Sequence, residues 1–222
     1  MPWMGHLQPA QWSGFGRIGL AAYLLGCFTS GYYLVRYRTG QDIRVIGSGS
    51  VGARNVGRVL GWQGFLLTVL ADFAKGVLAI WAVRRFTHDE ALVAIAMLAV
   101  VSGHIWPFQL RGHGGKGMAT ALGALCFYDF HLAAAFAVAF ITAFVFIRKT
   151  ILPGLLAFAC LPLVAAFLGG EAFAQGYDPV KVSGVWLLAT LVLIAHRKNI
   201  MDEISRFLDQ HKLRVHNDPP RL

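Results

Sequence analysis

Three polar segments interrupt an otherwise apolar chain, and their residues are of the types that bind negatively charged groups. The first segment, residues 47–58, reads GSGSVGARNVGR. Its glycines allow successive backbone N–H groups to point into one concavity, and its arginines can make forked contacts to phosphate oxygens. The candidate ligands here are Gly47, Ser48, Gly49, Ser50, Arg54, Asn55 and Arg58. Taken alone, the segment also fits a flexible loop whose arginines only set membrane topology.

The second segment, residues 103–123, reads GHIWPFQLRGHGGKGMATALG. Pro107 and the glycines at 112, 114, 115 and 117 prevent a regular helix, so the chain must break here between two apolar stretches. Lys116 then lies directly before a helix start, where free N–H groups and the helix dipole favour an anion. Irregular backbone at membrane depth is tolerated only where it lines a cavity or is buried in protein, which favours a site. The candidates in this segment are His104, Gly114, Gly115, Lys116 and Thr120.

The third segment, residues 195–200, reads AHRKNI and places His196 and Asn199 three residues apart on one helix face. A single histidine at the end of an apolar stretch is more often interfacial than catalytic, so it gains weight only beside the other segments. Histidine has a reference pKa of about 6.5, which suits a general base. The base is therefore His196, His104 or a phosphate oxygen of the substrate, and the sequence leaves that choice open.

Asp72 and Lys75 lie near the middle of an apolar stretch, three residues apart and on one helix face. Each charge alone would cost roughly 2.5 to 3.5 kcal/mol at the centre of a bilayer. The two are therefore expected to pair. We favour an ion pair that holds the structure together over a role in catalysis.

The elements that must position these segments are apolar. Of the 222 residues, 56% are hydrophobic and only 14% are charged, and long apolar runs recur along almost the whole chain, which indicates a polytopic membrane protein. The net charge of +9 comes from basic residues between the runs, so no nucleic-acid partner is expected. Cys27, Cys126 and Cys160 lie inside apolar runs without a CxxC spacing, so we expect no metal site, and no cofactor.

The apolar stretches are 18–35, 62–83, 91–107, 118–128, 132–147, 150–168 and 182–195. The region 118–147 fits either one long helix or a hairpin of two short helices with residues 129–131 at its tip. Basic residues concentrate on the cytoplasmic side of membrane proteins. Only the hairpin puts the basic pair at 148–149 and the basic triplet at 196–198 on the same side of the membrane as the early arginines. We therefore predict an all-α protein with seven transmembrane helices, the amino terminus outside and the carboxyl terminus in the cytoplasm.

This arrangement brings all three polar segments out on the cytoplasmic side. It leaves Arg84 and Arg85 on the external side, where Asp89 and Glu90 partly offset them. After residue 199, apolar residues at 200, 204, 207 and 208 predict an amphipathic helix lying on the cytoplasmic membrane surface.

Together, the three segments resemble those of the bacterial membrane glycerol-3-phosphate acyltransferases that use acyl phosphate as donor. The similar features are a G-S-G-x-x-G-x-x-N-x-x-R loop at 47–58, a G-H-x-x-P…G-G-K-G-x-A-T segment at 103–120 and H-R-x-N-I at 196–200. The DFAKG at 72–76 is also similar to the family's second span. The resemblance covers about residues 20 to 205, with the segments in the family's order.

The resemblance implies transfer of a fatty acyl group from acyl phosphate to the 1-hydroxyl of glycerol 3-phosphate, giving lysophosphatidic acid and phosphate in the first step of phospholipid synthesis. It implies a multi-pass protein of the bacterial inner membrane, contact with membrane lipids and functional coupling to an enzyme that produces acyl phosphate. The domains would be an external segment at 1–17, the seven-helix acyltransferase domain at 18–199 and a cytoplasmic helix and tail at 200–222.

The same resemblance implies catalytic roles for Ser48, Arg58, Lys116 and His196, with substrate binding by the other candidates. Our hypothesis is that the first-segment amides, Ser48 and Lys116 hold the leaving acyl phosphate. Arg58, His196 and Asn199 would hold the phosphate of the acceptor. An acyl phosphate is a mixed anhydride, so positioning and charge neutralisation suffice and no enzyme nucleophile is required.

The chain departs from the family pattern at a few positions. The family usually has Asn at the position of Ser50, Thr at that of Arg54 and Lys at that of His113, and a serine usual after the fifth span has no clear counterpart. These departures keep two alternatives open: an inactive homologue, and one that acts on another phosphorylated acceptor. An anion transporter is a third alternative, but it would need more polar residues along several spans.

Overall fold

The computed structural model describes residues 9–168 and 178–217, and every regular element within these ranges is a helix. The α-helices are α1 (Pro9–Cys27), α2 (Ser30–Thr39), α3 (Ala53–Arg84), α4 (Glu90–Ile105), α5 (Met118–Tyr128), α6 (Phe130–Ile147), α7 (Ile151–Leu168), α8 (Pro179–Ala195) and α9 (Arg197–Asn217). Two short 3-10 helices, η2 (Ile43–Val45) and η3 (Phe108–Leu110), lie in the loops. The predicted all-α class is confirmed, whereas residues 1–8 of the predicted segment 1–17 and residues 218–222 of the predicted segment 200–222 lie outside the described residues.

Every predicted apolar stretch overlaps a helix. Four helical stretches are long and apolar enough to cross a membrane: Gly14–Thr39, Ala53–Arg84, Glu90–Leu110 and Phe130–Ile147. A fifth is added if α8 and the start of α9, which are bent by 60°, count as one span, while α5 and α7 are apolar but shorter. The protein is therefore a multi-pass membrane protein, and the helix lengths alone support four or five crossings.

The first predicted stretch is broken, because α1 ends at Cys27 and α2 begins at Ser30. The break leaves the carbonyl groups of Gly26 and Phe28 without partners in a continuous helix. Lys75 of α3 donates to both, with N–O distances of 3.1 Å and 2.8 Å. A tertiary contact therefore stabilises this break, which was not predicted from the sequence although Thr29, Ser30 and Gly31 stand at it.

Glycines let the principal helix pairs approach closely. Helix α1 packs against α4, and α3 packs against α5. A Cβ added at Gly26 of α1 or at Gly103 of α4 would overlap a backbone carbonyl of the facing helix, and Gly76 and Gly123 form the same reciprocal arrangement between α3 and α5. Small residues at such crossings allow close backbone packing between helices in membranes, which fixes the position of α4 and α5 on either side of the second polar segment.

The hairpin predicted for residues 118–147 is confirmed, and one long helix is wrong. Helix α5 ends at Tyr128 and α6 begins at Phe130. The carboxylate of Asp129 accepts hydrogen bonds from the backbone N–H groups of His131 and Leu132, at 3.0 Å and 3.1 Å, and so caps α6. An aspartate that ends one apolar helix and caps the next is the local reason for the reversal.

A cluster of charges joins four helices at the end of the bundle away from the polar segments. Arg84 makes two hydrogen bonds to the carboxylate of Glu90, at 2.8 Å and 3.0 Å. Lys181 lies 3.7 Å from Glu90 and 3.9 Å from Asp129. The pairing neutralises Arg84, which accounts for a basic residue at the end that the topology prediction places outside.

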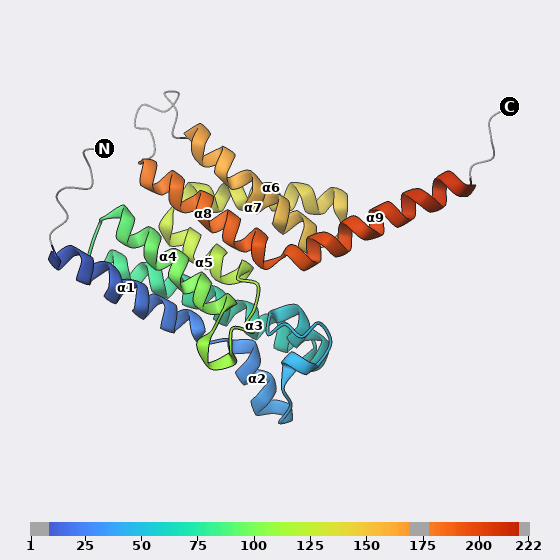
Figure 1. Cartoon of the computed structure of the whole chain (residues 1–222), viewed down its shortest axis with the longest axis horizontal. Coiled ribbons are helices and arrows are strands. Elements are labelled where there is room, and N and C mark those ends of the chain that lie inside the picture. Colours follow the sequence, from blue (N-terminus) through green and yellow to red (C-terminus); the bar gives the residue numbers. More distant parts are fainter. Residues whose placement is uncertain (1–8, 169–177, 218–222) are drawn as a thin grey trace.

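Helix α9 extends away from the bundle after the bend at the end of α8 (Figure 1). Met201, Ile204 and Leu208 are exposed, with 61%, 48% and 52% of their surface accessible. The side chain of Phe207, which belongs to the predicted apolar face, lies outside the described part of the structure. The helix that the sequence predicts after residue 199 is present, beginning at Arg197.

Candidate active site

The side-chain amide of Asn55 holds the backbone of the first polar segment. Asn55 lies in the first turn of α3 and is only 2% exposed. Its Nδ2 donates to the carbonyl groups of Ile46 and Ser50, at 2.8 Å and 3.0 Å, and its Oδ1 accepts from the backbone N–H of Ser48 at 3.1 Å. Both ends of the amide are thus committed to the loop, so Asn55 shapes the segment rather than presenting its side chain to a ligand.

The loop that Asn55 holds needs glycine at position 47. Gly47 has a φ of 58°, and a Cβ there would overlap the Oδ1 of Asn55. Gly49 also has a positive φ, and the Ser50 hydroxyl accepts a hydrogen bond from the N–H of Gly52 at 3.2 Å. The glycine-dependent loop is therefore present, but the N–H groups of Ser48 and Gly49 donate within it, to Asn55 Oδ1 and Ile46 O, so they do not point into a shared concavity.

The side chains of Ser48, Arg54 and Arg58 are exposed around this loop. In the part of the chain that the structure describes, none of the three makes a side-chain hydrogen bond or ion pair. Arg58 Nη1 lies 3.8 Å from the position that a Cβ of Gly47 would take, so the guanidinium sits beside the loop. These groups are available to bind an anion.

Arg44 ties the first polar segment to the second. Its guanidinium pairs with Asp42 at 2.6 Å, packs over the ring of Tyr32 at 5.2 Å and donates to the carbonyl of Leu110 at 3.2 Å. The hydrogen bond from Arg44 holds the pKa of the Asp42 carboxyl below its usual value. Leu110 also packs with apolar residues around the first segment, so the two segments form one body.

The second polar segment folds back onto the end of α4. The N–H groups of Gly114 and Gly115 donate to the carbonyl groups of Ile105 and His104, at 3.1 Å and 3.0 Å. Lys116 follows directly, half-buried, and α5 begins at Met118. Lys116 thus directly precedes the start of a helix, as the sequence predicts, where the first N–H groups have no partner within the helix.

Lys116 joins the second polar segment to the third. Its ammonium group donates a hydrogen bond to Oδ1 of Asn199, which lies in the first turn of α9. Burial lowers the pKa of Lys116, and the positive charges of Arg54 and Lys198 lower it further, against the opposing carboxylate of Asp202. Cations from α3, the α4–α5 loop and α9 are thus concentrated in one place. We call Arg54, Lys116 and Lys198, together with the neutral His196 and Asn199 beside them, the cation cluster.

His196 lies at the end of α8 and is 4% exposed. Its Nδ1 is 2.9 Å from the carbonyl oxygen of Val192. Because a carbonyl only accepts, Nδ1 carries the ring proton and Nε2 keeps its lone pair. The charge of Lys116 acts on this ring, so a candidate general base stands within the cation cluster.

His104 and Thr120 lie apart from the cluster. His104 is 3% exposed, and its Nδ1 lies 2.7 Å from the ammonium nitrogen of Lys75, which pairs with Asp72 at 3.1 Å. Thr120 is fully buried in α5, and its hydroxyl has no hydrogen-bond partner among the described residues. Asp72 and Lys75 form the structural pair favoured from the sequence. We call Ser30, Asp72, Lys75 and His104 the buried charge network.

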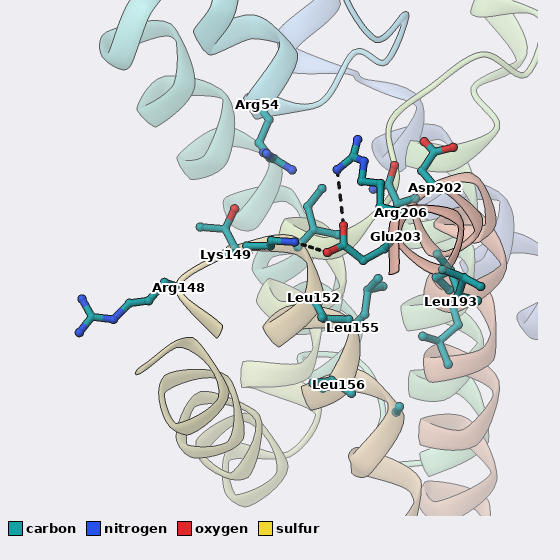
Figure 2. Close-up of a pocket in the computed structure, with 16 residues that line it drawn as sticks. Arg54, Arg148, Lys149, Leu152, Leu155, Leu156, Leu193, Asp202, Glu203 and Arg206 are labelled. Carbon is teal, nitrogen blue, oxygen red and sulfur yellow. Dashed lines mark hydrogen bonds and ion pairs between the residues drawn. The ribbon is translucent and has the colours of Figure 1, made fainter. Parts of the chain in front are cut away.

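A cavity of about 890 Å³ opens beside the cation cluster (Figure 2). Arg54 and Asn199 lie at its polar side, and an apolar wall is formed by Leu152, Leu155, Leu156, Ala159 and Leu193. Lys149 pairs with Glu203 of α9, while Arg148 points away from this pair (Figure 2). The cavity thus offers a cationic end to the anionic group of a ligand and an apolar wall to its hydrocarbon part.

The sequence did not identify several residues that line this cavity. Arg148 and Lys149 were noted only as markers of topology, and Glu203 and Arg206 of α9 were not noted. The available signal was the basic pair at the predicted cytoplasmic end of the sixth stretch. Among the described residues, no group of three or more His, Cys, Asp or Glu side chains could hold a metal ion.

A family model described as "Glycerol-3-phosphate acyltransferase" matches residues 17–206. The chain belongs to the glycerol-3-phosphate acyltransferase family. A curated glycerol-3-phosphate acyltransferase 1 of Desulfitobacterium hafniense (strain Y51) is 41% identical over 187 residues, covering 84% of this chain and 89% of the relative. A glycerol-3-phosphate acyltransferase of Prochlorococcus marinus (strain MIT 9301) is 34% identical over 180 residues, covering 81% of this chain and 89% of the relative.

Solved structures of an acyltransferase of this family share the fold. The crystal structure of PlsY (YgiH), an integral membrane glycerol 3-phosphate acyltransferase, in its glycerol 3-phosphate form, has a TM-score of 0.75 and 32% identity. The match covers 86% of this chain and 92% of that chain. The lysophosphatidic acid form of the same enzyme has a TM-score of 0.73 and 31% identity, over the same shares. The predicted resemblance to this acyltransferase family is thereby confirmed.

Proposed function

We propose that this protein transfers a fatty acyl group from acyl phosphate to the 1-hydroxyl of glycerol 3-phosphate, releasing lysophosphatidic acid and inorganic phosphate. The observation that carries the proposal is the hydrogen bond between Lys116 and Asn199, two residues 83 positions apart in the sequence. It joins the group assigned to the acyl phosphate to a group assigned to the acceptor. Two phosphate-bearing substrates must lie side by side for direct transfer, and this contact supports that arrangement.

The residues divide between the two anions. Ser48 through its hydroxyl, the N–H groups of Gly47 and Ser50, which have no acceptor among the described residues, and Lys116 bind the phosphate that leaves with the donor. Arg58 and Asn199 bind the phosphate of glycerol 3-phosphate, whereas Nε2 of His196 carries no proton to donate to it and is left for the acceptor hydroxyl. Arg54 adds a positive charge where the cation cluster meets the cavity. The apolar wall of the cavity suits the acyl chain, which enters from the lipid phase.

The chemical step needs only position and charge. The 1-hydroxyl oxygen attacks the carbonyl carbon of the acyl phosphate, the bond from that carbon to the phosphate oxygen breaks, and the phosphate leaves with the electron pair. Lys116 neutralises the negative charge that grows on the leaving group. The proton of the hydroxyl passes to Nε2 of His196, which holds a lone pair because Nδ1 donates to Val192.

We also propose the membrane arrangement expected from the sequence: seven crossings in the bacterial inner membrane, with the site at the cytoplasmic surface. The separation of the two ends supports it. Arg84, Glu90, Asp129 and Lys181 cluster at one end, while the three polar segments gather at the other. In this arrangement α9 lies along the cytoplasmic membrane surface, and the acyl phosphate reaches the site from an enzyme that produces it.

The test is release of phosphate from palmitoyl phosphate by purified protein in lipid nanodiscs. Release should depend on glycerol 3-phosphate, with lysophosphatidic acid identified by mass spectrometry, and should not occur with glycerol. Lys116→Ala and Arg58→Ala should each lose nearly all turnover while keeping the elution volume and melting temperature of the parent. Release with a different phosphorylated alcohol alone would replace the acceptor, and no release with any acceptor would overturn the proposal.

A further inference from the structure

His104 touches both the buried charge network and the loop that carries Lys116. We propose that His104 is a positioning residue, whose ring is fixed by the network and in turn supports Gly115, so that the Lys116 ammonium is held against Asn199. The kinetic part of this proposal rests on the proposed function. The structural part does not, because it concerns only where the loop lies.

The buried charge network fixes the ring from one side. The Lys75 ammonium donates its three hydrogen bonds to Gly26 O (3.1 Å), Phe28 O (2.8 Å) and His104 Nδ1 (2.7 Å), and forms a salt bridge with Asp72 Oδ1 at 3.1 Å. An ammonium group only donates, so Nδ1 of His104 accepts and the ring proton lies on Nε2. Asp72 is itself held by the hydroxyl of Ser30 at 2.9 Å. The ring therefore has one orientation.

The loop at Gly115 contacts the other side of the His104 ring. The Gly115 N–H donates to the backbone carbonyl of His104 at 3.0 Å. A Cβ added at Gly115 would overlap Nε2, and it would lie 2.7 Å from Cε1 and 3.0 Å from Cδ2. No space remains between ring and loop, so a displacement of the ring displaces Gly115, and Lys116 is the next residue.

The hydrogen bonds of His104 argue against a direct role in the reaction. Its Nδ1 accepts from Lys75 and its Nε2, which faces Gly115, carries the ring proton, so neither nitrogen is free to take a proton from a substrate. His196, by contrast, lies beside Lys116 and keeps an unprotonated Nε2. Of the two histidines predicted as candidate bases, the geometry thus assigns His196 to the reaction and His104 to support.

The test compares a steric clash that a substitution of His104 can relieve with a matched steric clash that it cannot relieve. In Gly115→Ala the new methyl group meets the far atoms of the His104 ring. His104→Asn removes those atoms, Nε2 and Cε1, but keeps an oxygen near the Nδ1 position to accept from Lys75. The control is Gly114→Ala, whose methyl group meets the backbone carbonyl of His104, which no side-chain change removes. Each alanine variant is made alone and together with His104→Asn.

Gly115→Ala should lower kcat/KM by about 100-fold, because a shift of about 1 Å in a positioning element has an effect of that size. The loss should fall mainly on kcat, since Lys116 acts on charge that develops during transfer. The double variant Gly115→Ala/His104→Asn should recover at least about tenfold over Gly115→Ala. Gly114→Ala should gain nothing from His104→Asn. Near-normal kinetics of Gly115→Ala, no recovery in the double variant, or equal recovery with Gly114→Ala would each overturn the proposal.

A second readout needs no turnover. The pH midpoint for acetylation of Lys116 by an amine reagent, followed by mass spectrometry, reports the surroundings of the ammonium group, which include Arg54, Lys198, Asp202 and His196. Gly115→Ala should move this midpoint up toward that of an ordinary lysine, and the double variant should return it. If wild-type protein releases no phosphate but these shifts occur, the function fails and the positioning role stands. An unchanged midpoint contradicts the positioning role whatever the kinetics.

Discussion

Two lysines are linked to His104, and the structure uses them in opposite ways. Lys75 is buried, and its ammonium group donates all three of its hydrogen bonds, to two carbonyl groups and an imidazole nitrogen, and is paired with the carboxylate of Asp72. Lys116 is half-buried, donates to the single amide oxygen of Asn199 among the described residues, and lies near the positive charges of Arg54 and Lys198.

The difference shows how a membrane protein separates charge for structure from charge for binding. The charge of Lys75 is neutralised within the protein, so its ammonium group has no free N–H to donate to a ligand. Lys116 stands among cations whose mutual repulsion an anionic ligand would relieve. The two regions should therefore respond differently to the same substitution.

The largest contrast is expected between Lys116→Met and Lys75→Met. Lys116→Met should reduce kcat/KM by about 1,000-fold, because it removes a fixed charge that stabilises the leaving phosphate. Its melting temperature should stay near that of the parent, whereas Lys75→Met should lower it clearly. Phosphate release and thermal unfolding, both in nanodiscs, measure the two effects. Equal losses of stability in both variants would remove the distinction between the regions.

The next-largest effect is the loss of stability expected when the buried ion pair of Asp72 and Lys75 is broken. Lys75→Met leaves Asp72 buried and unpaired, and this should reduce the free energy of unfolding by about 3–5 kcal/mol. Adding Asp72→Asn removes the orphaned charge, so the double variant should be more stable than Lys75→Met alone. Unfolding by denaturant in mild detergent compares the variants. A double variant that is no more stable than Lys75→Met would show that the charge of Asp72 is not what destabilises it.

The pH dependence of turnover sharpens the account of Lys116. Turnover requires the charged ammonium, so activity should fall as pH rises through the lowered pKa of Lys116, which lies below the lysine reference of about 10.4. Arg54→Met removes a positive neighbour, so the alkaline fall in kcat/KM should move to higher pH. The position of the fall is compared, rather than the maximal rate, because Arg54 also contacts the site. A fall that moves to lower pH would contradict the assignment.

The smallest effect is expected at the exposed ion pair between Lys149 and Glu203. Glu203→Gln should leave the melting temperature close to that of the parent, because water and salt screen such pairs. Ser205→Ala, on the same helix, serves as the control. A loss as large as that of Lys75→Met would mean that α9 is held to the bundle by this pair.

The sequence predicted most of the helices because the length of an apolar stretch can be read from consecutive residues. Residues 118–128 were bounded correctly, and Asp129 was placed at the hairpin tip because a charge between two apolar runs has few other positions. The break at Phe28 was missed, since the ammonium group that stabilises it comes from Lys75, 47 residues away. Similarly, Asn55 was expected at the ligand, whereas the structure commits its amide to the loop backbone.

The sequence by itself determined that this is a helical membrane protein with three polar segments of residue types that suit anions, because composition and local motifs depend only on neighbouring residues. Only the tertiary structure decided the different surroundings of His104 and His196, the contact of Lys116 with Asn199, and the apolar cavity beside them. The physical reason is that hydrogen-bond partners and burial depend on which helices pack together, and close contacts at glycines such as Gly26 and Gly123 set that packing.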